Sequence, residues 1–163
     1  MSKSFIEFKN KGFWIPDAVI SLVARYLEYI ITTDKMVPEW IAEMQNHLHH
    51  LSLEHYPGWA SLPLNNNLTD EDKKKEFILV LEKTIDFLKT KGDVISIVEL
   101  NANRDDNFST TWQKDINTIN LIHVIKRLIN LINENDGYNY REDFILSIIN
   151  PEAPDRPEPP SSR

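Results

Sequence analysis

Four of the chain's five histidines lie within residues 45–55, QNHLHHLSLEH, and imidazole is the side chain that binds metal most often in proteins. If this stretch is helical, His47, His50 and Glu54 lie three and four residues apart on one face, a geometry that can hold zinc. The spacing is not that of an HExxH motif, however, and no glutamate stands between the histidines as a general base. The same side chains also lie opposite the apolar stripe of the helix. The sequence therefore favours a polar helix side that faces water or a partner, with no metal and no cofactor.

Other patterns that carry catalysis are missing from the sequence. The chain has four glycines and no cysteine, so it has no glycine-rich phosphate loop, no GxSxG elbow and no thiol chemistry. Asp105 and Asp106 are a pair of carboxylates, but adjacent residues in a loop rarely converge on one ion. We therefore predict that the protein is not an enzyme and that it acts by binding.

Helix start and stop signals divide the first part of the chain. A proline followed by an acidic residue marks a helix start at Pro16 and again at Pro38, and the apolar spacing predicts helices over 17–31 and 39–54. A third helix is expected to be capped by Thr69 and to end before Gly92, with acids in its first turn and lysines in its last. These three helices are predicted to share one core.

The second part of the chain is also predicted to be helical. Residues 116–132 are apolar on almost every side, which indicates the central helix of a bundle, and a last helix is expected over 140–149. Residues 151–163 contain five prolines and are expected to be extended or disordered. The sequence thus predicts an all-α fold, a single domain over 1–150 that is a bundle of five to six helices with a proline-rich tail.

The stretch GDVISIVELNAN, residues 92–103, has two interpretations. Residues 94–98 have the composition of a strand, whereas Ser96 and Glu99 form a Ser-x-x-Glu capping box that favours a short helix. The short helix is preferred because no second convincing strand is visible to pair with it.

The net charge of −7 is concentrated in the second half of the chain. Residues 93–150 contain nine acidic residues and five basic ones, and Asp105 and Asp106 lie there in a polar loop with Glu99 just before it. Such a surface repels a phosphate backbone, and it either attracts a basic partner or only keeps the protein in solution. We therefore expect a protein partner rather than nucleic acid, with these three carboxylates in the contact.

Two aromatic residues lie in the other polar loop, residues 56–68. Tyr56 and Trp59 stand among prolines, a glycine and asparagines, where large side chains have little core to fill. Because aromatic residues dominate the energetics of many interfaces, these two are the second candidate site for partner contact. No stretch approaches the roughly 20 apolar residues of a membrane span, and charged residues interrupt the N-terminus, so cytoplasmic residence without membrane contact is expected.

One family resemblance adds to these expectations. The stretch NKGFWIPDAVISLVARYLEYI, residues 10–30, opens with Asn-Lys-Gly-Phe-Trp and soon reaches Asp17; VELN, a tryptophan and a long apolar helix follow later. With these features the chain resembles the bacterial immunity proteins of contact-dependent growth inhibition and related toxin systems. The resemblance covers part of the chain, and its motifs are structural.

The resemblance implies cytoplasmic residence and tight binding to one cognate toxin domain, commonly a nuclease. It carries over no catalytic residue. Two other classes remain open from the sequence: a histidine-dependent metal hydrolase on a helical bundle, and a helical adaptor with no toxin partner.

Overall fold

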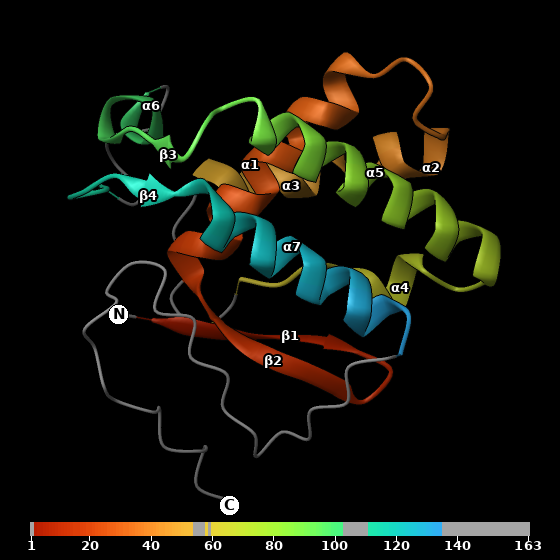
Figure 1. The fold of residues 1–163 in the computed structure, drawn as a ribbon. Coiled ribbons are helices and arrows are strands. Elements are labelled where there is room, and N and C mark those ends of the chain that lie inside the picture. Colours follow the sequence, from red (N-terminus) through yellow and green to blue (C-terminus); the bar gives the residue numbers. More distant parts are fainter. Residues whose placement is uncertain (1, 54–57, 59, 103–110, 135–163) are drawn as a thin grey trace, which may run out of the picture.

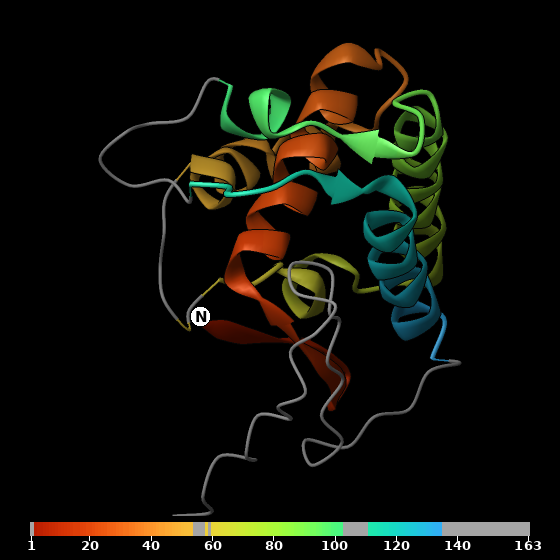
Figure 2. The ribbon, with the colours of Figure 1, turned by 60° about the vertical axis from the view of Figure 1, so that its left-hand side comes forward.

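Helix α1 (Asp17–Thr33) lies in the middle of the fold, in a computed structural model that describes residues 2–53, 58, 60–102 and 111–134 (Figure 1). Helix α3 (Gln45–Leu53) packs on one side of it, and α5 (Glu71–Lys89) and α7 (Thr118–Ile132) pack on the other (Figure 2). The buried apolar side chains of all four helices belong to one hydrophobic cluster. The helix predicted over 17–31 is confirmed.

A β-hairpin precedes α1 and covers one end of the helices. Strand β1 (Lys3–Phe8) pairs antiparallel with β2 (Lys11–Pro16), and Lys9 and Asn10 form the two-residue turn between them. Both turn residues have positive φ angles, 48° and 66°, which match the right-handed twist of paired strands. Gly12 is required in β2, because a Cβ at this position would lie 2.1 Å from the carbonyl oxygen of Ile6. The prediction of an all-α fold is therefore wrong from the first element onward.

A second, smaller sheet lies apart from the hairpin (Figure 1). Strand β3 (Val94–Ile95) pairs antiparallel with β4 (Ile116–Asn117), and α6 (Ile97–Asn101) follows β3 directly. The capping box is confirmed in part, since the hydroxyl of Ser96 accepts the backbone N–H of Glu99 at 3.2 Å. Both interpretations of this stretch thus hold, one after the other. The missing strand partner is the stretch that was predicted to begin the long apolar helix.

The helix predicted over residues 39–54 is divided in two. Helix α2 (Glu39–Ala42) ends in a tighter turn, in which the N–H of Met44 donates to the carbonyl oxygen of Ile41, three residues back, and α3 begins at Gln45. The loop predicted over 56–68 contains a single helical turn, α4 (Leu64–Asn67), which packs against β1. The break lets α2 and α3 contact α1 at different places.

Helix α5 agrees with the sequence apart from its cap. The side chain of Asp70, rather than that of Thr69, accepts the backbone N–H of Lys73 at 2.9 Å, so the helix begins one residue later than predicted. Gly92 has a φ of 81°, which is the conformation expected of a glycine after a helix end.

Helix α7 is not the central helix of the fold. Its apolar side packs against α5 and α1, while His123, Lys126 and Asn130 are exposed on the other side. The excess of isoleucine and leucine had indicated burial on nearly all sides, and Ile119 is instead half exposed. The helix that is buried on several sides is α1.

Two expectations lie outside the described residues, namely the helix over 140–149 and the proline-rich tail over 151–163. Within the described ranges, none of the helices combines the length and the apolar character needed to cross a bilayer.

Candidate functional site

A groove of about 620 Å³ runs along α1, and it is large enough for a small ligand or for several side chains of a partner. Residues of α1 from Ala18 to Thr33 form its floor. The C-terminal half of α3 supplies one wall, and the end of α5 with α6 supplies the other. The groove therefore lies between α3 on one side of α1 and the end of α5 with α6 on the other.

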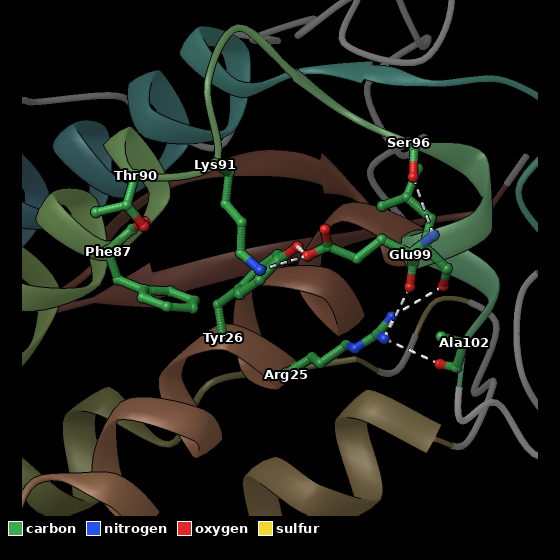
Figure 3. A network of polar contacts seen from close by, with 9 residues as sticks. Arg25, Tyr26, Phe87, Thr90, Lys91, Ser96, Glu99 and Ala102 are labelled. Atoms are coloured by element: carbon green, nitrogen blue, oxygen red, sulfur yellow. Dashed lines mark hydrogen bonds and ion pairs between the residues drawn. The ribbon is translucent and has the colours of Figure 1, made fainter.

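Arg25, on the floor of the groove, fastens α6 to α1 (Figure 3). Its guanidinium group donates hydrogen bonds to three backbone carbonyl oxygens, those of Leu100 at 2.8 Å, Glu99 at 3.0 Å and Ala102 at 2.9 Å. The last carbonyls of a helix have no partner within the helix and carry its negative dipole end. Arg25 donates hydrogen bonds to these carbonyl oxygens and places a positive charge beside them, so its guanidinium group holds α6 in place.

The carboxylate of Glu99 lies beside Arg25 and is held by two other side chains (Figure 3). The ammonium group of Lys91 lies 2.9 Å from Glu99 Oε1, and the hydroxyl of Tyr26 donates to the same oxygen at 3.0 Å. The second oxygen, Oε2, accepts no hydrogen bond from the described residues. One oxygen of this carboxylate is therefore engaged, and the other has no hydrogen-bond donor among the described residues.

These contacts shift the pKa values of Glu99 and Tyr26. Partial burial acts to raise the pKa of Glu99, but the hydrogen bonds from Lys91 and Tyr26 and the nearby positive charges outweigh it and hold that pKa below its ordinary value. Burial, followed by the charge of Glu99, raises the pKa of Tyr26 far above its ordinary value. At neutral pH Glu99 is therefore a carboxylate and Tyr26 a neutral phenol.

Aromatic rings complete the surroundings of Lys91. Its ammonium nitrogen lies 4.9 Å from the ring centroid of Phe87, within the range of a cation–π interaction. Phe87 in turn stacks on Tyr29, with ring centroids 4.6 Å apart and an interplanar angle of 26°. Tyr29 is 47% exposed, so one member of the stack can be reached from solvent.

The histidines of α3 point to different partners and do not converge. His49 Nδ1 lies 2.8 Å from Glu28 Oε1 on the floor of the groove, and His47 Nε2 donates to the carbonyl oxygen of Ser61 at 3.0 Å. His50 is exposed, and Glu54 lies outside the described residues. No group of three or more histidines and carboxylates in the described part of the chain is arranged to hold a metal ion. The polar-side interpretation of these histidines agrees with their exposure.

Of the five residues predicted to contact a partner, the structure describes Glu99 alone. Tyr56, Trp59, Asp105 and Asp106 lie outside the described residues. The described residues next to them are informative, however, because Leu53 precedes the first of these segments and lines the groove, as do Ala102 and Trp112 around the second. Described residues that border both of these segments in the sequence thus line the same groove.

The side chain of Asn101 clamps the ends of the second segment together. Its amide nitrogen donates to the carbonyl oxygen of Trp112 at 3.0 Å, and its amide oxygen accepts the N–H of Trp112 at 2.9 Å. This pair of bonds reproduces the exchange between two residues of antiparallel strands. The exit and return of the chain are therefore fixed relative to α6.

Sequence reasoning missed the cationic and aromatic residues of the groove. Arg25 had a signal, since it is a charged residue in the apolar run of α1, and a charge in such a place usually has a specific partner. Lys91 had been assigned only to the end of a helix, and Tyr29 and Phe87 had not been singled out. Their association depends on the contact between α1 and α5, which no local pattern indicates.

The structure predicts a pH dependence for the contribution of Glu99 to stability. Because its pKa in the folded protein lies below the ordinary 4.5, the carboxylate should stabilise the fold fully above that pH and lose the effect as the pH falls through the lowered value. The difference in free energy of unfolding between wild type and Glu99→Gln should therefore be largest at neutral pH and shrink in acid. Denaturant unfolding across this pH range is the measurement.

The Lys91→Met background is the control for this experiment. Without the ammonium group the pH dependence of the Glu99→Gln effect should be smaller, because Lys91 makes the largest contribution that lowers the pKa. A wild-type effect that does not change between neutral and acid pH would show that Lys91 and Tyr26 do not hold this carboxylate in solution.

Comparison with known proteins assigns no role to any residue of the groove. The similarity of residues 10–30 to immunity proteins stays a prediction, carried by the sequence features given above. The chain matches no protein-family description, no curated protein and no solved structure.

Proposed function

We propose that this chain is an immunity protein of the bacterial cytoplasm, which binds one cognate toxin domain and neutralises it. The observation that carries the proposal is that Leu53, Ala102 and Trp112, described residues that border the two candidate segments in the sequence, all line the groove along α1. A partner that docks over the groove would contact these three residues together with Glu99. A surface built from segments distant in sequence on a rigid helical frame is typical of recognition sites.

The chemistry of the groove supports binding rather than catalysis. Its charged groups are already paired: Arg25 with backbone carbonyls, Lys91 with Glu99, and His49 with Glu28. A general base needs a reacting proton within hydrogen-bond reach, and a nucleophile needs an adjacent base. In the groove the hydroxyl of Ser52 lies 3.4 Å from Glu28 Oε2, but it makes its shorter hydrogen bond to the backbone carbonyl oxygen of His49 at 2.7 Å. We therefore propose that the protein acts by binding its partner rather than by catalysis.

Charge supports a basic partner, for which a nuclease toxin is the expected example. The net charge is −7, and the excess of acid lies in the half of the chain that contains α6 and the segment after it. Nucleases bind phosphate through basic surfaces, and complementary charge speeds association and excludes wrong partners. We propose that the acidic surface covers the nuclease active site and so keeps nucleic acid out.

The proposal predicts the effect of neutralising two acids. Asp105→Asn with Asp106→Asn should slow association with the toxin domain and weaken its salt dependence if these side chains lie at the rim of the contact. If they are buried against arginine or lysine, the loss should be about 2–5 kcal/mol and should appear in dissociation. The measurement is the binding kinetics of wild type and variant, at two salt concentrations, with the product of the toxin reading frame that the proposal expects beside this gene.

A matched control separates local contact from total charge. Glu39→Gln with Asp72→Asn removes the same two charges from exposed positions on α2 and α5 that do not line the groove. This variant should bind almost as the wild type does. Equal effects of the two variants would assign the steering to net charge alone, and no complex between wild type and the neighbouring toxin domain would contradict the immunity function itself.

A further inference from the structure

Lys91 occupies a position in the groove that is built for a cation. A carboxylate oxygen of Glu99 lies on one side of its ammonium nitrogen at 2.9 Å, and the ring of Phe87 lies on another at 4.9 Å (Figure 3). The phenol of Tyr26 fixes the carboxylate, and Tyr29 extends the aromatic surface toward solvent. An acid beside stacked aromatic rings is a general arrangement for binding ammonium and guanidinium groups.

We infer that this position is a recognition site for an arginine side chain of the basic partner, and that Lys91 fills it in the free protein. The inference rests on the proposed function for the identity of the partner. The chemistry of the site rests on the described residues alone.

Lys91 is held weakly enough to be exchanged. It lies two residues after the end of α5, its side chain is 27% exposed, and its ammonium group has one carboxylate as its ionic partner among the described residues. Partly exposed lysine–glutamate pairs contribute little to stability, and the four-carbon stem of lysine can swing into water without moving the backbone. Arg25 differs in this respect, because three carbonyl oxygens hold its guanidinium group in place.

Arginine would use the site more fully than Lys91 does. An ammonium group engages only Oε1 of Glu99, and Oε2 accepts no hydrogen bond from the described residues. A guanidinium group can donate to both oxygens of one carboxylate and can also stack its plane on an aromatic ring. Phe87, whose ring lies on the far side of the Lys91 ammonium group from the carboxylate, offers such a ring.

The net charge of the groove lining becomes more negative when Lys91 leaves, which also favours a cation. The lining then contains two carboxylates, Glu28 and Glu99, and one cationic side chain, Arg25, apart from His49. Because Arg25 is committed to backbone carbonyls and Glu28 is paired with His49, Glu99 is the carboxylate left to meet an incoming cation. A basic segment laid along α1 is therefore favoured over an acidic one.

The test uses N-acetyl-L-arginine amide as a probe of the isolated, full-length protein. Lys91→Met keeps the stem of the side chain and removes its charge, so the probe should bind this variant about five- to tenfold more tightly than wild type by NMR titration. Glu99→Gln in the same background should remove the gain, and N-acetylglycine amide, which lacks the guanidinium group, should not bind. Shifts should centre on Tyr29 and Phe87.

Equal binding of the probe to wild type and Lys91→Met would overturn the inference, and Lys91→Gln repeats the comparison if the methionine variant does not fold. The result is separable from the proposed function. A toxin complex that forms while the probe shows no preference contradicts the arginine site only, whereas probe binding without any toxin complex contradicts the immunity function only.

Discussion

Leu128→Ala is expected to lower the free energy of unfolding by about 2–5 kcal/mol, the range measured when a large side chain is removed from a packed core. Leu128 is 1% exposed and lies on the side of α7 that packs against α5 and α1. The substitution removes apolar contacts, and the helices around it are held by many others, so the space is expected to persist as a cavity. Chemical denaturation followed by circular dichroism measures the loss.

Ile119→Ala is the matched control on the same helix. Ile119 is 52% exposed, so its truncation should change the free energy of unfolding by no more than about 0.5 kcal/mol. A comparable small change for Leu128→Ala would mean that α7 does not contribute to the core in solution and that the packing order of the helices is different.

Asp17→Ala is expected to cost about 3–5 kcal/mol, because one buried carboxylate joins three parts of the fold. Asp17 is 1% exposed; its Oδ1 accepts the hydroxyl of Ser4 in β1 at 2.5 Å, and its Oδ2 accepts the N–H of Gly58 at 2.8 Å. Hydrogen bonds to a charged group contribute about 1.5–3 kcal/mol each, and the carboxylate also lies at the positive end of α1. Removing it leaves the buried hydroxyl of Ser4 without its partner.

Two further substitutions divide this effect into its parts. Glu39→Ala changes the equivalent residue at the start of α2, also directly after a proline but exposed, and should cost no more than the roughly 0.3–1 kcal/mol of a helix-dipole interaction. Ser4→Ala removes one hydrogen bond and should fall between the two. If thermal and chemical unfolding give Asp17→Ala the same small cost as Glu39→Ala, the buried contacts of Asp17 do not stabilise the protein.

The parts of the fold that could be predicted are those with local signals. Helix α5 has acids first, lysines last and a glycine with positive φ after it, and each of these is read from a few neighbouring residues. The capping box of Ser96 and Glu99 likewise determines α6 within four positions. Such elements are specified by the chain close to them, before any tertiary contact is made.

The strands could not be predicted in the same way. The turn of the first hairpin is Lys9-Asn10, with no glycine, although two residues with positive φ usually include one. Strands β3 and β4 are two residues each, too short for any alternation to be seen, and they pair across a long separation in sequence. Both sheets are determined by the helices they pack on, which a single-sequence pattern does not contain.

The candidate site shows the same division. Glu99 was identified from charge and capping, yet its carboxylate also binds Lys91 and Tyr26, which the sequence did not associate with it. The floor and walls of the groove come from α1, α3, α5 and α6, so its composition depends on how these helices pack. Residue types indicated what Glu99 could bind, and the tertiary structure determined what lies within its reach.

The Asn101 side chain fixes the two ends of the stretch between Ala102 and Trp112, whatever residues that stretch contains. Both of its ends are tied to one amide side chain, so substitutions, insertions or deletions between them need not disturb α6 or β4. Closing a longer loop costs little, about 0.6 kcal/mol for each doubling of its length. Insertions or deletions between Ala102 and Trp112 are therefore expected to change the free energy of unfolding little as long as Asn101 is kept.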